Sequence, residues 1–93
     1  MRTLPEAGEP MQRVAVRIYG EEYIVRGSAP REYIEMLARY VDEKMRQIER
    51  RNPYLSPGKL AVLTALNLAD ELMKLQEDYD NLVKLLGEET PGR

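Results

Sequence analysis

Few residues in this 93-residue chain could carry out chemistry. Histidine and cysteine are both absent, so the usual proton-transfer group near neutral pH and the thiolate nucleophile are missing. The nearest paired carboxylates are Asp70 with Glu71 and Asp78 with Asp80. Neighbouring residues of a helix diverge by about 100° around its axis, so we expect these groups to be solvated and not to share a proton or a metal ion. With no glycine-rich phosphate loop and no metal-ligand spacing, we predict neither an enzyme nor a bound cofactor.

Arginine is the other residue type that could act. Arginine forms planar, bidentate ion pairs at protein interfaces, and the chain holds far more arginine than lysine. Singly, each arginine is expected to lie on a solvated helix face with a partner four residues away, such as Glu35 with Arg39 and Asp42 with Arg46. As a cluster, Arg46, Arg50 and Arg51 are a candidate docking patch for an acidic protein surface. The net charge of −2 gives no field that would hold nucleic acid or an anionic membrane, so we expect a protein partner.

Length and hydropathy limit the architecture. A chain of this size supports one domain with a thin core, and without cysteine or a metal site, oligomerisation is the remaining means of stabilising it. No apolar run approaches the roughly 20 residues that cross a bilayer, and residues 1–11 lack the features of a signal peptide. We therefore expect a cytoplasmic protein. Residues 1–11, rich in Pro, Glu and Gly, are predicted to be a disordered leader.

Residues 12–27 have the alternation of a β-hairpin. Three apolar residues face one side of an extended chain: Val14, Val16 and Ile18. Gly20 and Glu21 predict a two-residue turn with glycine first, and residues 23–25 predict the return strand. A two-stranded hairpin is not stable alone in water, so it must pack against helices or another hairpin.

A first helix is predicted between Pro30 and Asn52. Ser28-Ala29-Pro30 is a typical helix start, and Arg50-Arg51-Asn52-Pro53 a typical end. Apolar residues recur at steps of three and four, which gives the helix one apolar face. They are Ile34, Leu37, Ala38, Val41, Met45 and Ile48.

A second, longer helix is predicted from Pro57, with Ser56 as its N-cap, to Gly87. Six residues follow at steps of 4, 3, 4, 3 and 4, the spacing of coiled-coil a and d positions: Leu68, Leu72, Leu75, Tyr79, Leu82 and Leu86. Residues 59–69 are apolar around most of the helix and are expected to pack partly on the first helix. That first helix is too short to cover the rest, so the six residues are predicted to form a dimer interface.

The predicted fold class is therefore α+β. It comprises an N-terminal two-stranded β-hairpin, one short helix, and one long C-terminal helix that forms a coiled-coil-like dimer. The expected divisions are the leader at 1–11, a globular head at 12–56, the dimerisation helix at 57–87 and a polar tail at 88–93.

Three stretches together resemble the ZapA family of cell-division proteins. They are the strand pair around residues 14–23, the helix segment LARYVDEKM at 37–45, and the block AVLTALNLADEL at 61–72. Each is weak alone, but the order and spacing also match, and the match covers residues 13 to about 80. The second helix ends near Leu86, which is short for the family, so the expected state is a homodimer, with a tetramer as the alternative.

The resemblance implies a non-enzymatic protein that binds FtsZ and bundles its protofilaments, promoting assembly and stability of the Z-ring at the mid-cell septum. The resemblance also implies that FtsZ is contacted through charged residues of the head. By exposure and charge, the candidates in this sequence are Arg17, Glu21, Lys44, Arg46, Arg50 and Arg51.

Other readings of the sequence remain open. A small dimeric DNA-binding protein would use the hairpin or first helix in a groove, although the nearly neutral head lacks a basic stripe. A generic coiled-coil scaffold would use the long helix alone. A small helical enzyme would use arginine and glutamate in a dimer cleft.

Overall fold

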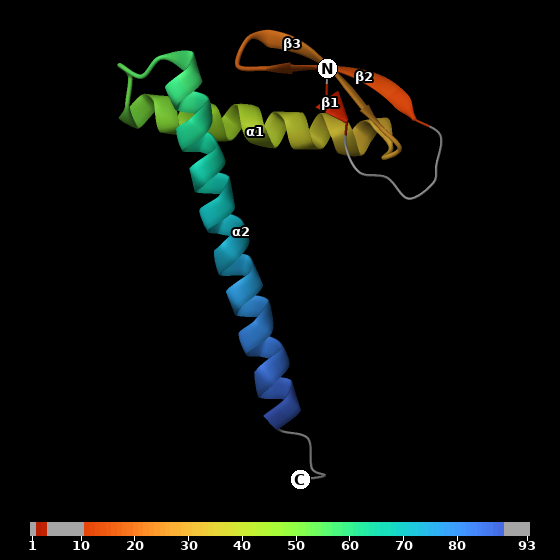
Figure 1. The fold of residues 1–93 in the computed structure, drawn as a ribbon, viewed down its shortest axis with the longest axis vertical. Coiled ribbons are helices and arrows are strands. Elements are labelled where there is room, and N and C mark those ends of the chain that lie inside the picture. Colours follow the sequence, from red (N-terminus) through yellow and green to blue (C-terminus); the bar gives the residue numbers. More distant parts are fainter. Residues whose placement is uncertain (1, 4–10, 89–93) are drawn as a thin grey trace.

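The computed structural model describes residues 2–3 and 11–88 (Figure 1). Its elements are β1 (Arg2–Thr3), β2 (Gln12–Ile18), β3 (Glu21–Gly27), α1 (Arg31–Arg51) and α2 (Pro57–Glu88). The predicted order of hairpin, short helix and long helix is confirmed. The two helices also begin and end close to their predicted bounds.

The sheet has one strand more than the sequence predicted. Its order is β1-β3-β2, with β1 parallel to β3 and β2 antiparallel to β3. β1 pairs Arg2 with Val25 and Thr3 with Arg26. Two residues are too few to show a strand period, so no pattern marked β1 within the expected leader. The rest of that leader, Met11 apart, and the tail from residue 89 lie outside the described residues.

The turn between β2 and β3 lies one residue earlier than predicted. Ile18 pairs with Glu21, so the turn residues are Tyr19 and Gly20 rather than Gly20 and Glu21. Both have positive φ, 52° for Tyr19 and 82° for Gly20, which is the combination of a type I′ turn. Glycine adopts this backbone freely, whereas tyrosine needs contacts that hold it there.

The buried core has two parts, both on α1. The first lies between β2 and the N-terminal half of α1 and consists of Val14, Val16, Ile34 and Ala38. The second lies between the C-terminal half of α1 and the start of α2 and consists of Met45, Ile48 and Leu60. Ile18 contacts both parts. The inward faces predicted for the strand and the first helix are therefore confirmed at these positions, with Leu37 and Val41 half-buried.

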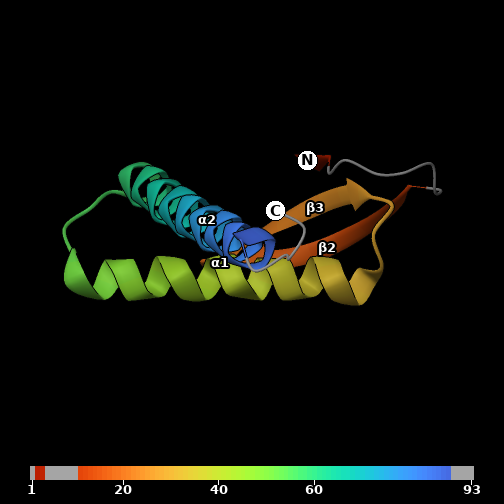
Figure 2. The ribbon, with the colours of Figure 1, turned by 90° about the horizontal axis from the view of Figure 1, so that it is seen from below.

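A short corner turns the chain from α1 into α2. The Asn52 N–H donates to the carbonyls of Ile48 and Glu49, which closes α1 before Pro53. Ser56 then caps α2 as predicted, because its Oγ accepts a hydrogen bond of 3.3 Å from the Lys59 N–H. α2 crosses the C-terminal part of α1 close to the start of α2 and then runs away from the sheet (Figure 1). Viewed from below, α2 and the sheet lie on the same side of α1 (Figure 2).

Candidate functional site

The face of α2 predicted to form the dimer interface is uncovered in the single chain. The helix has 32 residues and is about 48 Å long, against about 32 Å for the 21 residues of α1. Leu72, Leu75, Tyr79, Leu82 and Leu86 are between 55 % and 66 % exposed. Leu68 is half-buried. Because a continuous helix carries all six at a/d spacing, they form one apolar stripe. The helix itself extends far beyond the head (Figure 1).

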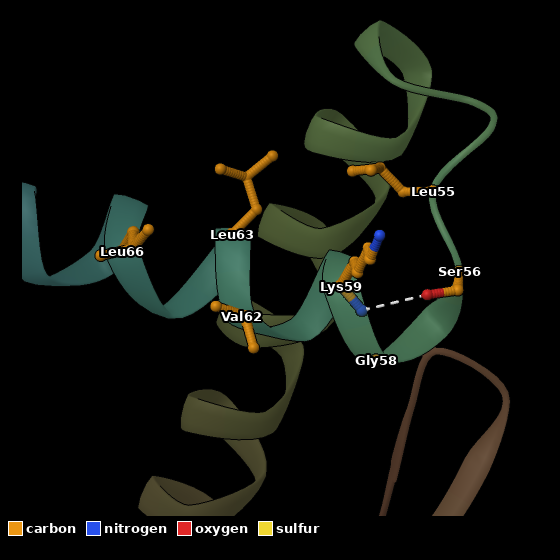
Figure 3. Close-up of a pocket in the computed structure, with 7 residues that line it drawn as sticks. All are labelled: Leu55, Ser56, Gly58, Lys59, Val62, Leu63 and Leu66. Carbon is orange, nitrogen blue, oxygen red and sulfur yellow. Dashed lines mark hydrogen bonds between the residues drawn. The ribbon is translucent and has the colours of Figure 1, made fainter.

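The beginning of α2 is also less covered than the sequence predicted. Leu60 and Thr64 are buried against α1, and Leu63 is half-buried. Val62 and Leu66 are 63 % and 61 % exposed, because α1 covers only one side of a helix that is apolar on several. They border a hollow of about 540 Å³ next to Leu55 and Lys59 (Figure 3). Packing of residues 59–69 on α1 is therefore confirmed for one side of α2 only.

A polar cluster ties α2 to α1 beside this crossing. The Tyr40 hydroxyl donates a hydrogen bond of 2.7 Å to Glu71 Oε1, and Lys44 Nζ pairs with Glu71 Oε2. The Lys44 ammonium also lies 5.6 Å from the centre of the Tyr40 ring. We call Tyr40, Lys44 and Glu71 the helix clamp.

Charge pairing within the helix clamp shifts the pKa values of Glu71 and Lys44. The hydrogen bond from Lys44, and then that from Tyr40, lower the pKa of the Glu71 carboxyl below its ordinary value. The same bond to Glu71 raises the pKa of Lys44. Both groups are therefore held in their charged forms, and together they fix where α2 leaves the head.

A second polar cluster holds the hairpin turn against α1. The Tyr19 N–H donates to Asp42 Oδ1 at 2.6 Å, and the Tyr19 hydroxyl donates to Glu49 Oε2 at 2.6 Å. Arg46 Nε pairs with Asp42 Oδ2 at 3.0 Å, and the Arg46 guanidinium lies 5.5 Å from the centre of the Tyr19 ring. These contacts explain how a tyrosine is kept at positive φ. We call Tyr19, Asp42, Arg46 and Glu49 the turn lock.

The turn lock also shifts the pKa of an acid. The hydrogen bond from Arg46, followed by that from the Tyr19 backbone, lowers the pKa of Asp42. The bond to Glu49 raises the pKa of the Tyr19 hydroxyl. The predicted Asp42–Arg46 pair is thus confirmed, whereas Glu35 and Arg39 form no ion pair in the described part of the chain. Sequence reasoning missed Tyr19 and Glu49 because both belong to the turn lock only through the fold.

The six candidate FtsZ-binding residues fall into two groups. Arg17 and Glu21, beside the hairpin turn, and Arg50 and Arg51, at the end of α1, are exposed. Lys44 belongs to the helix clamp, and its side chain is only 16 % exposed. Arg46 belongs to the turn lock. The turn lock brings the hairpin turn onto the same half of α1 that carries Arg50 and Arg51.

Three of the four paired carboxylates have polar partners among the described residues, and one of these, Asp80, accepts a hydrogen bond of 3.1 Å from the Gln76 side-chain amide. Glu71 belongs to the helix clamp, and Asp70 pairs with Lys74 at 3.1 Å. In residues 2–3 and 11–88, no three histidine, cysteine or acidic residues are placed to hold a metal ion. Within the same described part of the chain, no helix is long and apolar enough to span a membrane.

The fold and the site thus define a protein with a small α+β head joined to a long helix, whose apolar face is uncovered in the single chain. The ZapA model, described as "Cell division protein ZapA", matches residues 14–89. The chain belongs to the ZapA family.

Relatives of similar length carry the same family name. Cell division protein ZapA of Geobacillus thermodenitrificans is 48 % identical over 84 residues, which cover 90 % of this chain and 92 % of the relative. That of Geobacillus kaustophilus is 45 % identical over 85 residues, covering 91 % and 93 %. Among solved structures, a ZapA mutant dimer from Geobacillus stearothermophilus is similar, with a TM-score of 0.68, 39 % identity, and coverage of 90 % of this chain and 98 % of that one.

Proposed function

We propose that this chain is a non-enzymatic cell-division protein that dimerises through α2, binds FtsZ with its heads and bundles FtsZ protofilaments. It would act in the cytoplasm at the mid-cell septum and promote Z-ring assembly and stability. Neither nucleic acid, membrane nor cofactor takes part. The observation that carries the proposal is the apolar stripe of α2, which the chain itself leaves uncovered, in a protein of this family.

Dimerisation follows from the energetics of the stripe. Five large side chains more than half exposed along one face form an apolar surface of a kind that monomeric proteins rarely leave in water. Pairing two such helices buries the stripe in both copies. The related ZapA mutant from Geobacillus stearothermophilus is a dimer, which supports the same state for this chain, while the length of α2 leaves a tetramer open.

Bundling follows from carrying two heads on one particle. Once one head is bound to a filament, the second head is held near a neighbouring filament at a high effective concentration. Weak contacts at each head then suffice for a stable cross-link. A monomeric variant is expected to bind filaments without joining them.

The positions of the six candidates indicate which of them can contact FtsZ directly. Arg17, Glu21, Arg50 and Arg51 have exposed side chains at one end of the head, where a filament could reach them. Lys44 is committed to the helix clamp, so we propose for it a supporting role rather than direct contact. Arg46 remains part of the proposed surface because of its position on α1. Its ion pair with Asp42 would compete with a contact to FtsZ.

Filament scattering tests the proposal. Light scattering and pelleting of purified FtsZ with GTP are measured with and without equimolar protein. We expect a large rise in both signals, and a loss of most of that rise for Arg50→Glu combined with Arg51→Glu. Arg31→Glu, at the other end of α1, is the matched control and should bundle normally. Absence of any rise with a folded dimer would overturn the proposal.

A further inference from the structure

One edge of the sheet lies open beside α1. β3 lies between β1 and β2, so among the described residues β2 has a neighbouring strand on one side only. In an antiparallel pair, residues whose backbone groups bond to the partner strand alternate with residues whose backbone groups point away from it. Ile18 and Glu21, which close the turn, are a bonded pair, and the alternation is counted from them. The backbone N–H and C=O of Arg13, Ala15 and Arg17 therefore point away from β3. All three residues are exposed.

A hollow of about 190 Å³ lies between this edge and α1. It is lined by Ala15, Val16, Arg17, Glu35, Ala38 and Arg39. Val16 and Ala38 are buried and form an apolar floor, whereas the charged residues at the rim are two arginines and one glutamate. An extended segment lying along the edge would place alternate side chains over this floor.

Charge decides which strand fits the edge. β2 carries Arg13 and Arg17 and no acidic residue. If two copies paired antiparallel about Ala15, Arg13 of each copy would lie opposite Arg17 of the other. Like charges directly opposite each other destabilise strand pairing, and basic side chains on an edge strand oppose self-association. The edge is therefore unsuited to a second copy and suited to an acidic strand.

We propose that the free edge of β2 binds an extended acidic segment of a partner protein by strand addition. The backbone of Arg13, Ala15 and Arg17 supplies the hydrogen bonds, carboxylates of the segment lie opposite Arg13 and Arg17, and an apolar side chain fills the hollow. Arg17 Nη1 already donates to the Gly20 carbonyl at 2.9 Å, but a guanidinium has five donors and can bind a carboxylate as well. This surface goes beyond filament bundling. It shares Arg17 with the proposed FtsZ-binding surface but is separate from Arg50 and Arg51 at the end of α1.

A synthetic peptide of seven residues that alternates glutamate and valine is the probe. It is titrated to millimolar concentration into the full-length ¹⁵N-labelled protein, and the backbone amide shifts are followed by NMR. We expect saturable shifts centred on Arg13, Ala15 and Arg17 and at Ala38 across the hollow. A peptide with the same sequence and N-methylated alternate residues should bind at least about tenfold more weakly, because it lacks the backbone donors.

Two variants separate strand addition from general charge attraction. Ala15→Pro removes only the outward N–H, a position where an edge strand tolerates proline, so binding should fall about tenfold while Val14 and Val16 keep their amide shifts. Arg13→Glu should weaken binding about two- to fivefold and should improve binding of the lysine–valine version of the peptide. If Ala15→Pro unfolds, the charge exchange at Arg13 remains a complete test.

Three results would overturn the proposal. The first is the absence of saturable shifts along β2. The second is equal binding of the N-methylated peptide, which would indicate charge attraction alone. The third is shifts that depend on protein concentration and vanish in Ala15→Pro, which would show pairing with a second copy. Because the probe contains no FtsZ, none of these results depends on the bundling assay.

Discussion

The head and the outer half of α2 differ in whether their apolar side chains are buried within the single chain. In the head and the first turn of α2, Val14, Ile34 and Leu60 are at most 2 % exposed, so the chain completes this core by itself. Beyond residue 71, every described side chain of α2 is exposed, although leucine is its commonest apolar residue. The same residue types are thus buried by their own chain in one region and left for a partner in the other.

This difference shows where each region obtains its stability. A helix alone in water gains little from its own hydrogen bonds, and most helical stability in proteins comes from packing one apolar face. The head has that packing within one chain. The outer half of α2 must obtain it from another chain, so its stability is tied to protein concentration.

The largest predicted effect comes from charges placed in the apolar stripe of α2, because they would remove the partner helix on which its outer half depends. Leu75→Lys combined with Leu82→Lys puts a buried, unpaired charge at two steps of the proposed interface. We expect the dimer to weaken by at least about a hundredfold, measured by sedimentation velocity over a range of concentrations.

The matched control for this variant places the same charge away from the stripe. Glu77→Lys lies on the opposite side of α2 and should leave the dimer intact. A double variant that remains dimeric, or a control that dissociates equally, would contradict the assignment of the stripe as the interface.

Single truncations in the monomeric Leu75→Lys/Leu82→Lys background compare how much the head core and the outer half of α2 each contribute to the free energy of unfolding. Ile34→Ala should cost about 2–5 kcal/mol in the free energy of unfolding, because it leaves a cavity in the head core. Leu72→Ala should change the same quantity by less than about 0.5 kcal/mol, because Leu72 is 57 % exposed in the single chain. Both are measured by urea unfolding.

Either of two results would count against a self-contained head. Equal losses for Ile34→Ala and Leu72→Ala would mean that the outer half of α2 packs within the monomer. An unfolded monomeric background would mean that the head core needs the partner chain.

The regular features of the fold could be predicted because each is written in a local period. The inward residues of β2, the apolar face of α1 and the stripe of α2 all follow from spacing alone. Ser56 and Pro57 likewise mark the start of α2 by capping chemistry that involves adjacent residues only.

The missed features depend on residues far apart in the sequence. A turn around Gly20 is compatible with glycine in either turn position, and the choice of Tyr19 as its partner is set by Asp42, 23 residues away. Glu71 finds Tyr40 and Lys44 only after the two helices have crossed. For the same reason, Lys44 looked like a free surface cation in the sequence.

The helix clamp gives the smallest predicted effect, and its sign follows from the pKa of Glu71. Because folding lowers this pKa, the ionised clamp stabilises the folded state above the ordinary value of 4.5, and that stabilisation is lost as pH falls through the lower folded value. Glu71→Gln should therefore flatten the fall in melting temperature between about pH 5 and pH 3. Asp42, whose pKa is also lowered, retains part of the acid dependence in that variant.

Asp70→Asn is the matched control for the helix clamp, since Asp70 lies next to Glu71 and, among the described residues, has its ion pair with Lys74 on its own helix. An exposed pair within one helix contributes little to stability, so this variant should keep the acid dependence of the wild type. If both variants flatten the profile equally, the acid dependence reflects the general negative charge of α2. If only Glu71→Gln does so, the junction between the self-contained head and the partner-dependent helix is held by a specific ion pair.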